Sequence, residues 1–299
     1  MAAPDLQEIH DFLVPLARTA GATITAARPT TSSTDNKTNA ADLVTETDRA
    51  VESLISQKLR ERYPDYLFMG EETYKPGDTL TPSPTFIIDP IDGTTNFVHT
   101  YPYACISLGF CVDLVPVIGV VYNPFTDQLF TGIKGQGSYL TSPLHNHQKL
   151  PLKNLEPFYD ESGEGGLGKC LVIGEWGSNR SGNDYDVKVA TFKKLCADKK
   201  DGGAMVHSIR SLGSAALNIC SVAAGWADVY WEGGCWAWDV CAGWVVLKEA
   251  GGEVVDANPG RWKAAVDGRR YLAIRGGEGW EGVVKEFWDC VEGELEVGM

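Results

Sequence analysis

The chain has 299 residues, of which 43% are hydrophobic and 22% are charged, as in a globular protein with a sizeable core. Its formal net charge of −14 argues against general nucleic-acid binding and against attraction to anionic membranes. An acidic protein can still hold an anionic phosphate where bound cations reverse the local field, so the charge favours a metal-dependent phosphate site over a metal-free one.

Eight cysteines are present, and none of them forms a Cys-x-x-Cys pair or a zinc-binding spacing. The first residues lack the basic and apolar regions of a secretory signal, and no apolar run reaches the roughly 18 residues that a membrane span requires. We therefore expect reduced, mostly buried thiols in a cytoplasmic protein that has no membrane partner.

The N-terminal part of the chain predicts two helices separated by a loop. Apolar residues keep helical spacing near the start, and Pro15 should kink that helix or mark its true beginning. The stretch over 28–41 is rich in Thr, Ser and Asn and predicts a mobile loop. A second helix is expected over 47–62, begun by a capping pair formed by Thr45 and Asp48.

The middle of the chain predicts a group of strands that pair with their neighbours. Strands are expected over 85–88, 104–110 and 116–122, where β-branched and apolar residues are concentrated. A glycine-rich stretch over 132–137 predicts a tight connection. The pattern is typical of an antiparallel group.

A polar, glycine-rich stretch over 151–168 predicts a boundary within one compact unit. It would separate an N-terminal α+β portion, 1–150, from a C-terminal α/β portion, 151–299. The second portion should contain a strand at 171–173 and helices over 211–224 and 239–250. The order of elements favours a layered α/β fold.

The most informative segment is Asp89-Pro90-Ile91-Asp92-Gly93-Thr94-Thr95-Asn96. It follows a short apolar strand, so two carboxylates and free backbone N–H groups meet at one strand end. Carboxylate oxygens suit a divalent cation, and N–H groups suit a phosphate. Polar clusters of this kind are usually only turns, but the proline between the acids and the Gly-Thr-Thr after them are hard to explain in that way.

Three further acidic positions follow or begin apolar runs, namely Glu71, Asp239 and Asp42. Each alone is explained well as a helix cap or a solvated turn, and an aspartate at a helix N-terminus complements the helix dipole. Jointly they could converge on one pocket rim. Oxygen ligands with no nearby histidine favour magnesium or manganese over zinc, and two such ions can activate water for an in-line displacement.

The chain resembles the inositol monophosphatase family of magnesium-dependent phosphatases. The resemblance covers roughly residues 5 to 285 and rests on the acidic segments 42–48 and 70–72, on 89–97, on Gly213-Ser214-Ala215-Ala216 and on Trp238-Asp239. It implies an αβαβα sandwich of the sugar and inositol phosphatase type, sensitivity to lithium, a homodimer and a small phosphate ester as the partner molecule.

The resemblance also implies which residues hold metal. Two magnesium ions, which manganese can replace, would be bound by Glu71, Asp89, the Ile91 carbonyl, Asp92 and Asp239. Asp89 would bridge the two ions. Whether a third ion joins near Glu71 and the loop that carries Lys37 is left open.

Catalytic roles follow from the same resemblance. Glu71 and Thr94 would orient and deprotonate the attacking water, with Asp42 and Asp48 as supporting residues. The backbone N–H groups of Gly93 and Thr94 would hold phosphate oxygens.

Substrate contacts are implied for Gly93, Thr94, Ser214, Ala215, Glu232 and Asp239. Glu232 would hydrogen-bond to a hydroxyl of a polyol, although an exposed loop acid is the simpler explanation of that residue. Trp236 stands where well-known members often carry histidine. A large aromatic side chain there could narrow the pocket or stack on a sugar or nucleoside.

The leading interpretation is a phosphomonoesterase that hydrolyses myo-inositol monophosphate or a similar small polyol phosphate. Because of Trp236, a sugar phosphate, histidinol phosphate or a 3′-phosphorylated nucleotide remain alternative substrates. A non-catalytic, metabolite-binding regulatory protein on the same fold is a third interpretation, which the retained acidic set disfavours.

Overall fold

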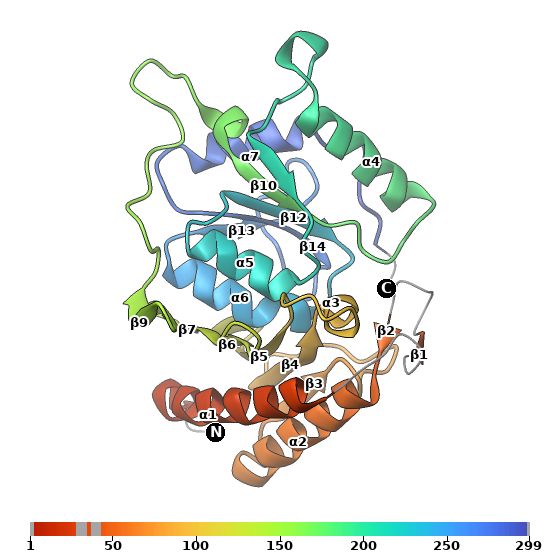
Figure 1. Ribbon diagram of the computed structural model, residues 1–299, viewed down its shortest axis with the longest axis vertical. Helices are drawn as coiled ribbons and strands as arrows, with labels where there is room; N and C mark the ends of the chain where they lie inside the picture. The colour runs from red at the N-terminus through yellow and green to blue at the C-terminus, as the bar shows by residue number, and fades with distance from the viewer. Residues whose placement is uncertain (1–2, 28–34, 37–42, 298–299) are drawn as a thin grey trace.

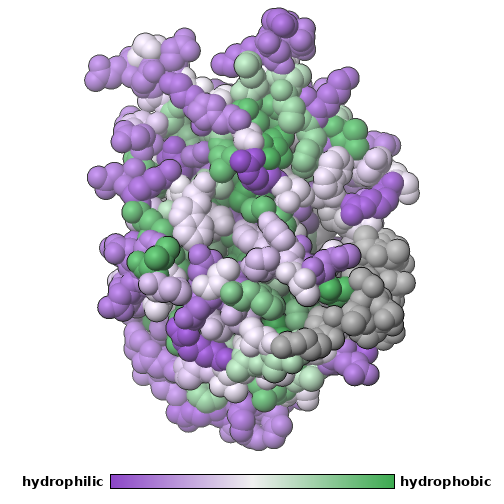
Figure 2. All heavy atoms as spheres, in the orientation of Figure 1, coloured by the Kyte–Doolittle hydropathy of each residue, from purple (hydrophilic) through white to green (hydrophobic). Residues whose placement is uncertain are grey.

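The computed structural model of the protein describes residues 3–27, 35–36 and 43–297. Two β-sheets alternate with three layers of helices, so the predicted αβαβα layering is confirmed (Figure 1). Polar side chains cover much of the face shown in Figure 2, with apolar ones gathered in patches between them. Within the described ranges, no helix has the length and apolar character needed to cross a membrane.

The larger sheet has seven strands, and helices α1 (Leu6–Ala26) and α2 (Glu46–Arg62) pack on its outer face. β3 and β4 are parallel, whereas all later neighbours are antiparallel, as the predicted strand group requires. The strands follow chain order: β3 (Leu67–Gly70), β4 (Thr85–Asp92), β5 (Cys105–Val112), β6 (Val115–Asn123), β7 (Gln128–Ile133), β8 (Gly137–Ser142) and β9 (His145–Lys149). A separate pair joins β1 (Asp35–Asn36) to β2 (Leu43–Val44).

The smaller sheet has five strands, and its outer face packs against α4 (Asn183–Cys196) and α7 (Trp280–Trp288). The strand order is β11 (Ser208–Arg210), β10 (Leu171–Gly174), β12 (Val229–Gly233), β14 (Arg270–Ile274) and β13 (Glu253–Val255). Short 3-10 turns lie at Gly166–Lys169 and Lys199–Asp201.

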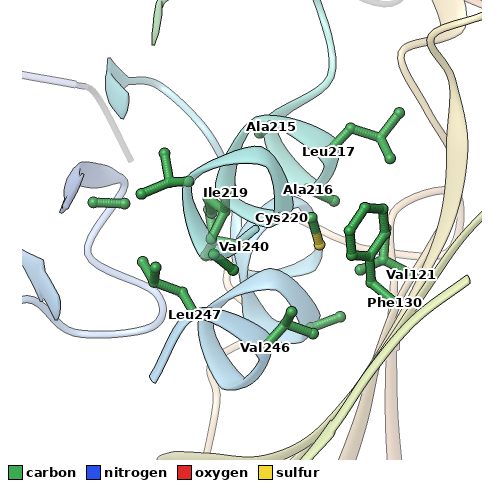
Figure 3. Packing of buried hydrophobic residues seen from close by; sticks show 14 of the residues in the cluster. Val121, Phe130, Ala215, Ala216, Leu217, Ile219, Cys220, Val240, Val246 and Leu247 are labelled. Atoms are coloured by element: carbon green, nitrogen blue, oxygen red, sulfur yellow. The ribbon is translucent and has the colours of Figure 1, made fainter. Parts of the chain in front are cut away.

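Helices α5 (Ala215–Ala223) and α6 (Ala237–Glu249) form the layer between the sheets, where they pack on Val121 and Phe130 (Figure 3). Two glycines allow α6 to approach the larger sheet closely. A Cβ at Gly119 would lie 2.1 Å from the Ala242 carbonyl oxygen, and one at Gly109 would lie 2.5 Å from Cys241 Sγ. This contact fixes the start of α6 beside the end of β4.

Several predicted boundaries needed correction. Helix α1 runs through Pro15, which therefore does not mark its beginning. The helix expected over 211–224 begins only at Ala215, because Gly213 adopts a left-handed φ of +82° and Ser214 caps the helix by accepting from the Leu217 N–H. The helix expected from residue 239 begins at Ala237, two residues earlier.

Other predicted elements hold more closely. The capping box of Thr45 and Asp48 is present at the start of α2. β4 extends four residues beyond the predicted strand, to Asp92, and the predicted connection over 132–137 is shorter because its ends belong to β7 and β8. The loop predicted over 28–41 lies outside the described residues except for β1. All eight cysteines are free, and every one but Cys196 is buried.

Candidate active site with an acidic metal centre

Three aspartates from separate positions in the chain meet at one point. Asp89 and Asp92 lie at the end of β4, and the register with β5 shifts between them. Asp239 comes from the first turn of α6. One carboxylate oxygen from each of the three lies within 4.8 Å of the other two, and Asp89 and Asp92 are buried. Such a set can hold a hard divalent cation.

Glu71 joins this group from the neighbouring strand. It follows β3 directly, and its backbone N–H donates to the Ile88 carbonyl at 3.2 Å, which carries the parallel pairing one residue beyond the strand. Its side chain lies close enough to Asp89 to raise the pKa of that carboxyl. Four acidic side chains predicted as metal ligands are therefore brought together, from the ends of β3 and β4 and from the start of α6.

The pKa values show how unfavourable this grouping is for four charges. Burial, and then repulsion from Glu71, Asp92 and Asp239, raises the pKa of Asp89 well above its usual range. Burial and its acidic neighbours raise the pKa of Asp239 in the same way. Burial raises the pKa of Asp92 to about 7 although two hydrogen bonds favour its charged form. A bound cation would reverse this cost, so the donor set fits a metal ion.

Helix N-termini hold two of the aspartates in place. Asp92 Oδ2 accepts from Ser214 Oγ at 2.6 Å and from the Ala216 N–H at 2.8 Å, at the start of α5. Asp239 Oδ2 accepts from the Trp236 N–H at 2.6 Å, at the start of α6. The simple interpretation of Asp239 as a helix cap is thus correct, and it is compatible with a second role because a carboxylate oxygen of Asp239 also lies within 4.8 Å of one from Asp89.

A sharp turn follows the aspartates and starts the short helix α3 (Thr94–Val98). Gly93 has a left-handed φ of +93°, and a Cβ there would lie 3.0 Å from the Tyr103 carbonyl oxygen. Thr94 Oγ1 lies 3.0 Å from the Ile91 carbonyl oxygen and 3.1 Å from Asp48 Oδ1. The turn thus links the β4 aspartates to α2.

Asp48 is a buried acid at the first turn of α2. Burial raises its pKa to about 6, against a hydrogen bond with Thr45, and Glu71 adds to the increase. The predicted proximity of Asp48 and Thr94 is therefore present. Asp42 and Lys37, the other two residues predicted near this turn, lie outside the described residues.

The predicted substrate contacts come from the smaller sheet and the middle helices. Ser214 caps α5, and Ala215 is its first residue. Glu232 is a buried acid near the end of β12, so its simple interpretation as an exposed loop residue is wrong. Tyr230 Oη donates to Glu232 Oε2 at 2.5 Å. Glu232 lies within electrostatic reach of the metal centre, because it raises the pKa of Asp92.

Two buried residues that support these contacts were missed by sequence reasoning. Glu175, just after β10, accepts hydrogen bonds from the loop before α5 and from α5 itself, namely from Ser211 Oγ, Leu212 N–H, Gly213 N–H and Asn218 Nδ2. Lys188, from α4, donates to the carbonyl oxygens of Trp176 and Gly233 at 3.1 and 2.7 Å. An acid directly after a strand was a usable signal for Glu175, whereas nothing local marked Lys188.

The layered fold and its buried acidic centre define a metal-dependent phosphatase of the α/β sandwich type. A profile of the inositol monophosphatase family matches residues 5–292, and the chain belongs to that family. It is 46% identical over 300 residues to "Inositol monophosphatase 2" of Saccharomyces cerevisiae, with 97% of each chain covered.

Solved structures agree with this family membership. The structure of the inositol monophosphatase from Anabaena superposes with a TM-score of 0.74 at 28% identity and covers 96% of both chains. SaIMPase-II, a staphylococcal IMPase, is 26% identical and has been solved with two ligands. Its inositol monophosphate complex superposes with a TM-score of 0.68 over 94% of this chain and 92% of that one, and its 2′AMP complex with 0.70 over 93% of each.

Proposed function

We propose that this phosphatase is a magnesium-dependent phosphomonoesterase that hydrolyses myo-inositol monophosphate or a similar small polyol phosphate. The observation that carries the proposal is the convergence of Asp89, Asp92 and Asp239 within 4.8 Å, with Glu71 beside them. Its inositol monophosphatase relatives in yeast, and the inositol monophosphate complex of SaIMPase-II, support this class of substrate.

Two magnesium ions would be held by oxygen ligands alone. Glu71, Asp89 and the Ile91 carbonyl would bind one, and Asp89, Asp92 and Asp239 the other, with manganese as a substitute. Hard carboxylate and carbonyl oxygens suit these metals. When bound, the ions would activate water and neutralise charge on the leaving oxygen.

Thr94 would orient the attacking water together with Glu71. Its hydroxyl lies 3.1 Å from Asp48 Oδ1, and burial raises the pKa of Asp48 to about 6. A carboxyl that ionises near neutral pH can take a proton during turnover, so Asp48 can receive the proton that Thr94 relays. Asp42 is a further candidate for support at this turn.

The substrate would be held at two ends. Backbone N–H groups of Gly93 and Thr94, at the start of α3, would bind phosphate oxygens. Glu232 would accept a hydrogen bond from a hydroxyl of the polyol, and Ser214 and Ala215 would line the space between. Lys37 would approach the phosphate. A nucleotide is the second candidate substrate, since SaIMPase-II has been solved with 2′AMP bound.

Three further properties follow from the family resemblance and are proposed with the activity. These are a homodimer, a cytoplasmic location and inhibition by lithium at one of the metal positions. Sedimentation of the purified protein tests the first of them.

The activity is tested by titrating phosphate release from myo-inositol 1-phosphate against magnesium and then against lithium. We expect no release in EDTA, a saturable increase with magnesium, and inhibition by lithium in the millimolar range. Absence of hydrolysis at every magnesium concentration would refute the proposal, and insensitivity to lithium would refute the proposed lithium site.

A further inference from the structure

The indole ring of Trp236 is clamped between two other side chains. The guanidinium carbon of Arg269 lies 3.7 Å from the centroid of the ring. The ring of Trp238 lies nearly parallel to it, with centroids 5.2 Å apart and an interplanar angle of 15°. Tyr74 is tilted by 51° against the same ring at 5.0 Å.

Arg269 and Trp238 must lie on opposite faces of Trp236. A guanidinium 3.7 Å above the centroid covers the middle of one face. A parallel ring whose centroid is only 5.2 Å away overlaps part of the indole, and on the same face it would collide with the guanidinium. Both faces of Trp236 are therefore covered by side chains of this chain.

The clamped ring lies directly beside the acidic centre. Trp236 precedes α6, and its N–H donates to Asp239 Oδ2 at 2.6 Å. Tyr74, which packs against the ring, lies three residues after Glu71. The charge of Arg269 is within electrostatic reach of Asp239. The ring and the acids therefore lie next to each other.

Both the backbone and the side chain of Arg269 are held by hydrogen bonds. Its φ is +60°, a left-handed conformation that an arginine rarely adopts. Its N–H donates to Tyr271 Oη at 3.0 Å, and its Nη2 donates to the Gly234 carbonyl oxygen at 2.9 Å. Surrounding contacts that maintain an uncommon backbone conformation point to a requirement for the side chain above the ring.

We propose that Arg269 is a specificity-determining positioning residue that keeps Trp236 as a rigid wall and denies its face to a nucleoside base. This inference rests on the proposed function, and it narrows the substrate to compact polyol phosphates. A base gains binding energy by stacking on an open aromatic face, and the clamped ring offers none. A polyol requires only the ring edge and a hydroxyl acceptor such as Glu232.

The test compares two phosphate esters on the same preparation of magnesium-loaded enzyme. Wild-type enzyme should have kcat/KM for myo-inositol 1-phosphate at least about 100-fold above that for 2′-AMP. In Arg269→Gly, whose backbone suits φ of +60°, the ratio of kcat/KM for 2′-AMP to that for the inositol ester should rise roughly tenfold, as expected for stacking of one base. The change should come mainly from a lower KM for 2′-AMP.

Because the readout is a ratio, any loss of folded enzyme cancels. Arg269→Lys keeps a cation over the ring and should move the ratio less than Arg269→Gly does. The matched control is Arg60→Ala, which removes an exposed arginine of α2 whose guanidinium carbon lies 5.5 Å from the centroid of the Phe68 ring, and it should leave the ratio unchanged.

Two results would overturn the inference, namely a wild-type enzyme that hydrolyses both esters equally well and a ratio that Arg269→Gly does not change. Failure of every ester to be hydrolysed would instead refute the proposed function. In that case the role of Arg269 is tested by binding instead of turnover. Titration calorimetry gives the ratio of the Kd values of 2′-AMP and myo-inositol 1-phosphate, which should be lower for Arg269→Gly than for the wild type.

Discussion

Buried carboxylates occur in two neighbouring regions that differ in how the protein stabilises their negative charge. One is the acidic centre; the other, called the substrate side, comprises Glu175, Glu232 and the start of α5, where the proposed substrate contacts lie. In the acidic centre, burial raises the pKa values of Asp89 and Asp239, and repulsion from the neighbouring acids raises them further. On the substrate side, Glu175 accepts four hydrogen bonds from the start of α5 and the loop before it. Glu232 has Lys188 within electrostatic reach, which counteracts the increase that burial causes in its pKa.

The difference shows which region depends on something outside the chain. A buried anion is stable when donors or cations of the protein surround it, as on the substrate side. In the acidic centre, the carboxylates accept some hydrogen bonds but also face one another, so the centre requires bound cations to become fully ionised. The fold therefore preassembles the surface proposed to contact the substrate, and it leaves the charge of the acidic centre for a metal ion to balance.

The largest effect should come from Asp89→Asn, which removes the carboxylate that is proposed to bridge the two ions. We expect kcat to fall by roughly 10⁴-fold or more, as for loss of a central catalytic group. The variant should also lose the stabilisation that magnesium gives the wild type. In EDTA, however, its Tm should be higher than that of the wild type, because one buried, mutually repelling carboxylate is gone.

Phosphate release and calorimetry with and without magnesium measure both effects. Asp65→Asn, which neutralises an exposed aspartate in the turn after α2, is the matched control and should change neither. Near-normal turnover in Asp89→Asn would contradict the proposed difference between the two regions, since the acidic centre would then function without the Asp89 carboxylate.

Thr94→Ala should have the next largest effect. Its hydroxyl contacts Asp48 and the Ile91 carbonyl, so its loss should disturb the water and spare most of the metal ligands. We expect kcat to fall by about 10² to 10³-fold, with the magnesium concentration for half-maximal activity changed far less. Thr94→Ser, which keeps the hydroxyl, should recover most of the activity. Equal losses of kcat and of magnesium affinity would assign Thr94 to the metal instead.

The acidic centre was largely predictable from the sequence, because most of its parts lie in short contiguous segments. Asp89, Asp92, Gly93 and Thr94 occupy one strand end and the turn after it, and Glu71 follows the adjacent strand. The capping pair of α2 is equally local. Strand ends, turns and helix caps depend on residues that are close together in the sequence, so their residue types alone indicate them.

The substrate side was less predictable, because its contacts join distant segments. The helix predicted over 211–224 begins later than expected. Glu175, which lies 38 residues before Gly213, accepts hydrogen bonds from the backbone N–H groups of the residues just before α5. Lys188 is one of several lysines in α4, and what distinguishes it is its hydrogen bonds to the distant Trp176 and Gly233 carbonyls. The clamp on Trp236 likewise depends on Arg269, which lies 33 residues later in the chain, directly before β14.

Lys188→Met tests the difference between the two regions, because it leaves Glu232, like the acids of the acidic centre, without a nearby cation of the protein. The variant removes the cation near Glu232 and leaves the Trp176 and Gly233 carbonyls without this donor. We expect kcat/KM for myo-inositol 1-phosphate to fall roughly tenfold, mainly through KM, because a charge-assisted hydrogen bond to the substrate is weakened. The pKa of Glu232 should rise further, so the increase in KM at acidic pH should begin at a higher pH than in the wild type.

Lys188→Arg should restore part of the affinity, and Lys193→Met, on an exposed face of the same helix, is the matched control. Steady-state kinetics between pH 5.5 and 8 distinguish the outcomes, with Tm recorded for each variant. A fall in kcat alone, with KM and its pH profile unchanged, would show that Lys188 does not act through Glu232.

The smallest effect concerns the stability of the metal-free protein. Burial, with neighbouring carboxylates, raises the pKa of Asp92 to about 7 and that of Asp48 to about 6, above the ordinary value of 3.8. The folded state therefore binds more protons than the unfolded state between these values. The associated stabilisation is complete below about pH 4 and is lost as the pH rises to about 7.

In EDTA we accordingly expect Tm to fall on the order of 5 °C between pH 5 and pH 8, and magnesium to raise Tm more at pH 8, where the carboxylates it binds are ionised. General repulsion in a chain of net charge −14 also lowers stability with rising pH, so the decisive measurement is the slope. Asp92→Asn, which lacks one titrating group of the centre, should show a shallower fall than the wild type in calorimetry. Equal slopes would mean that the hydrogen bonds from Ser214 and Ala216 already balance the charge of Asp92, and the two regions would then differ less than their neighbours suggest.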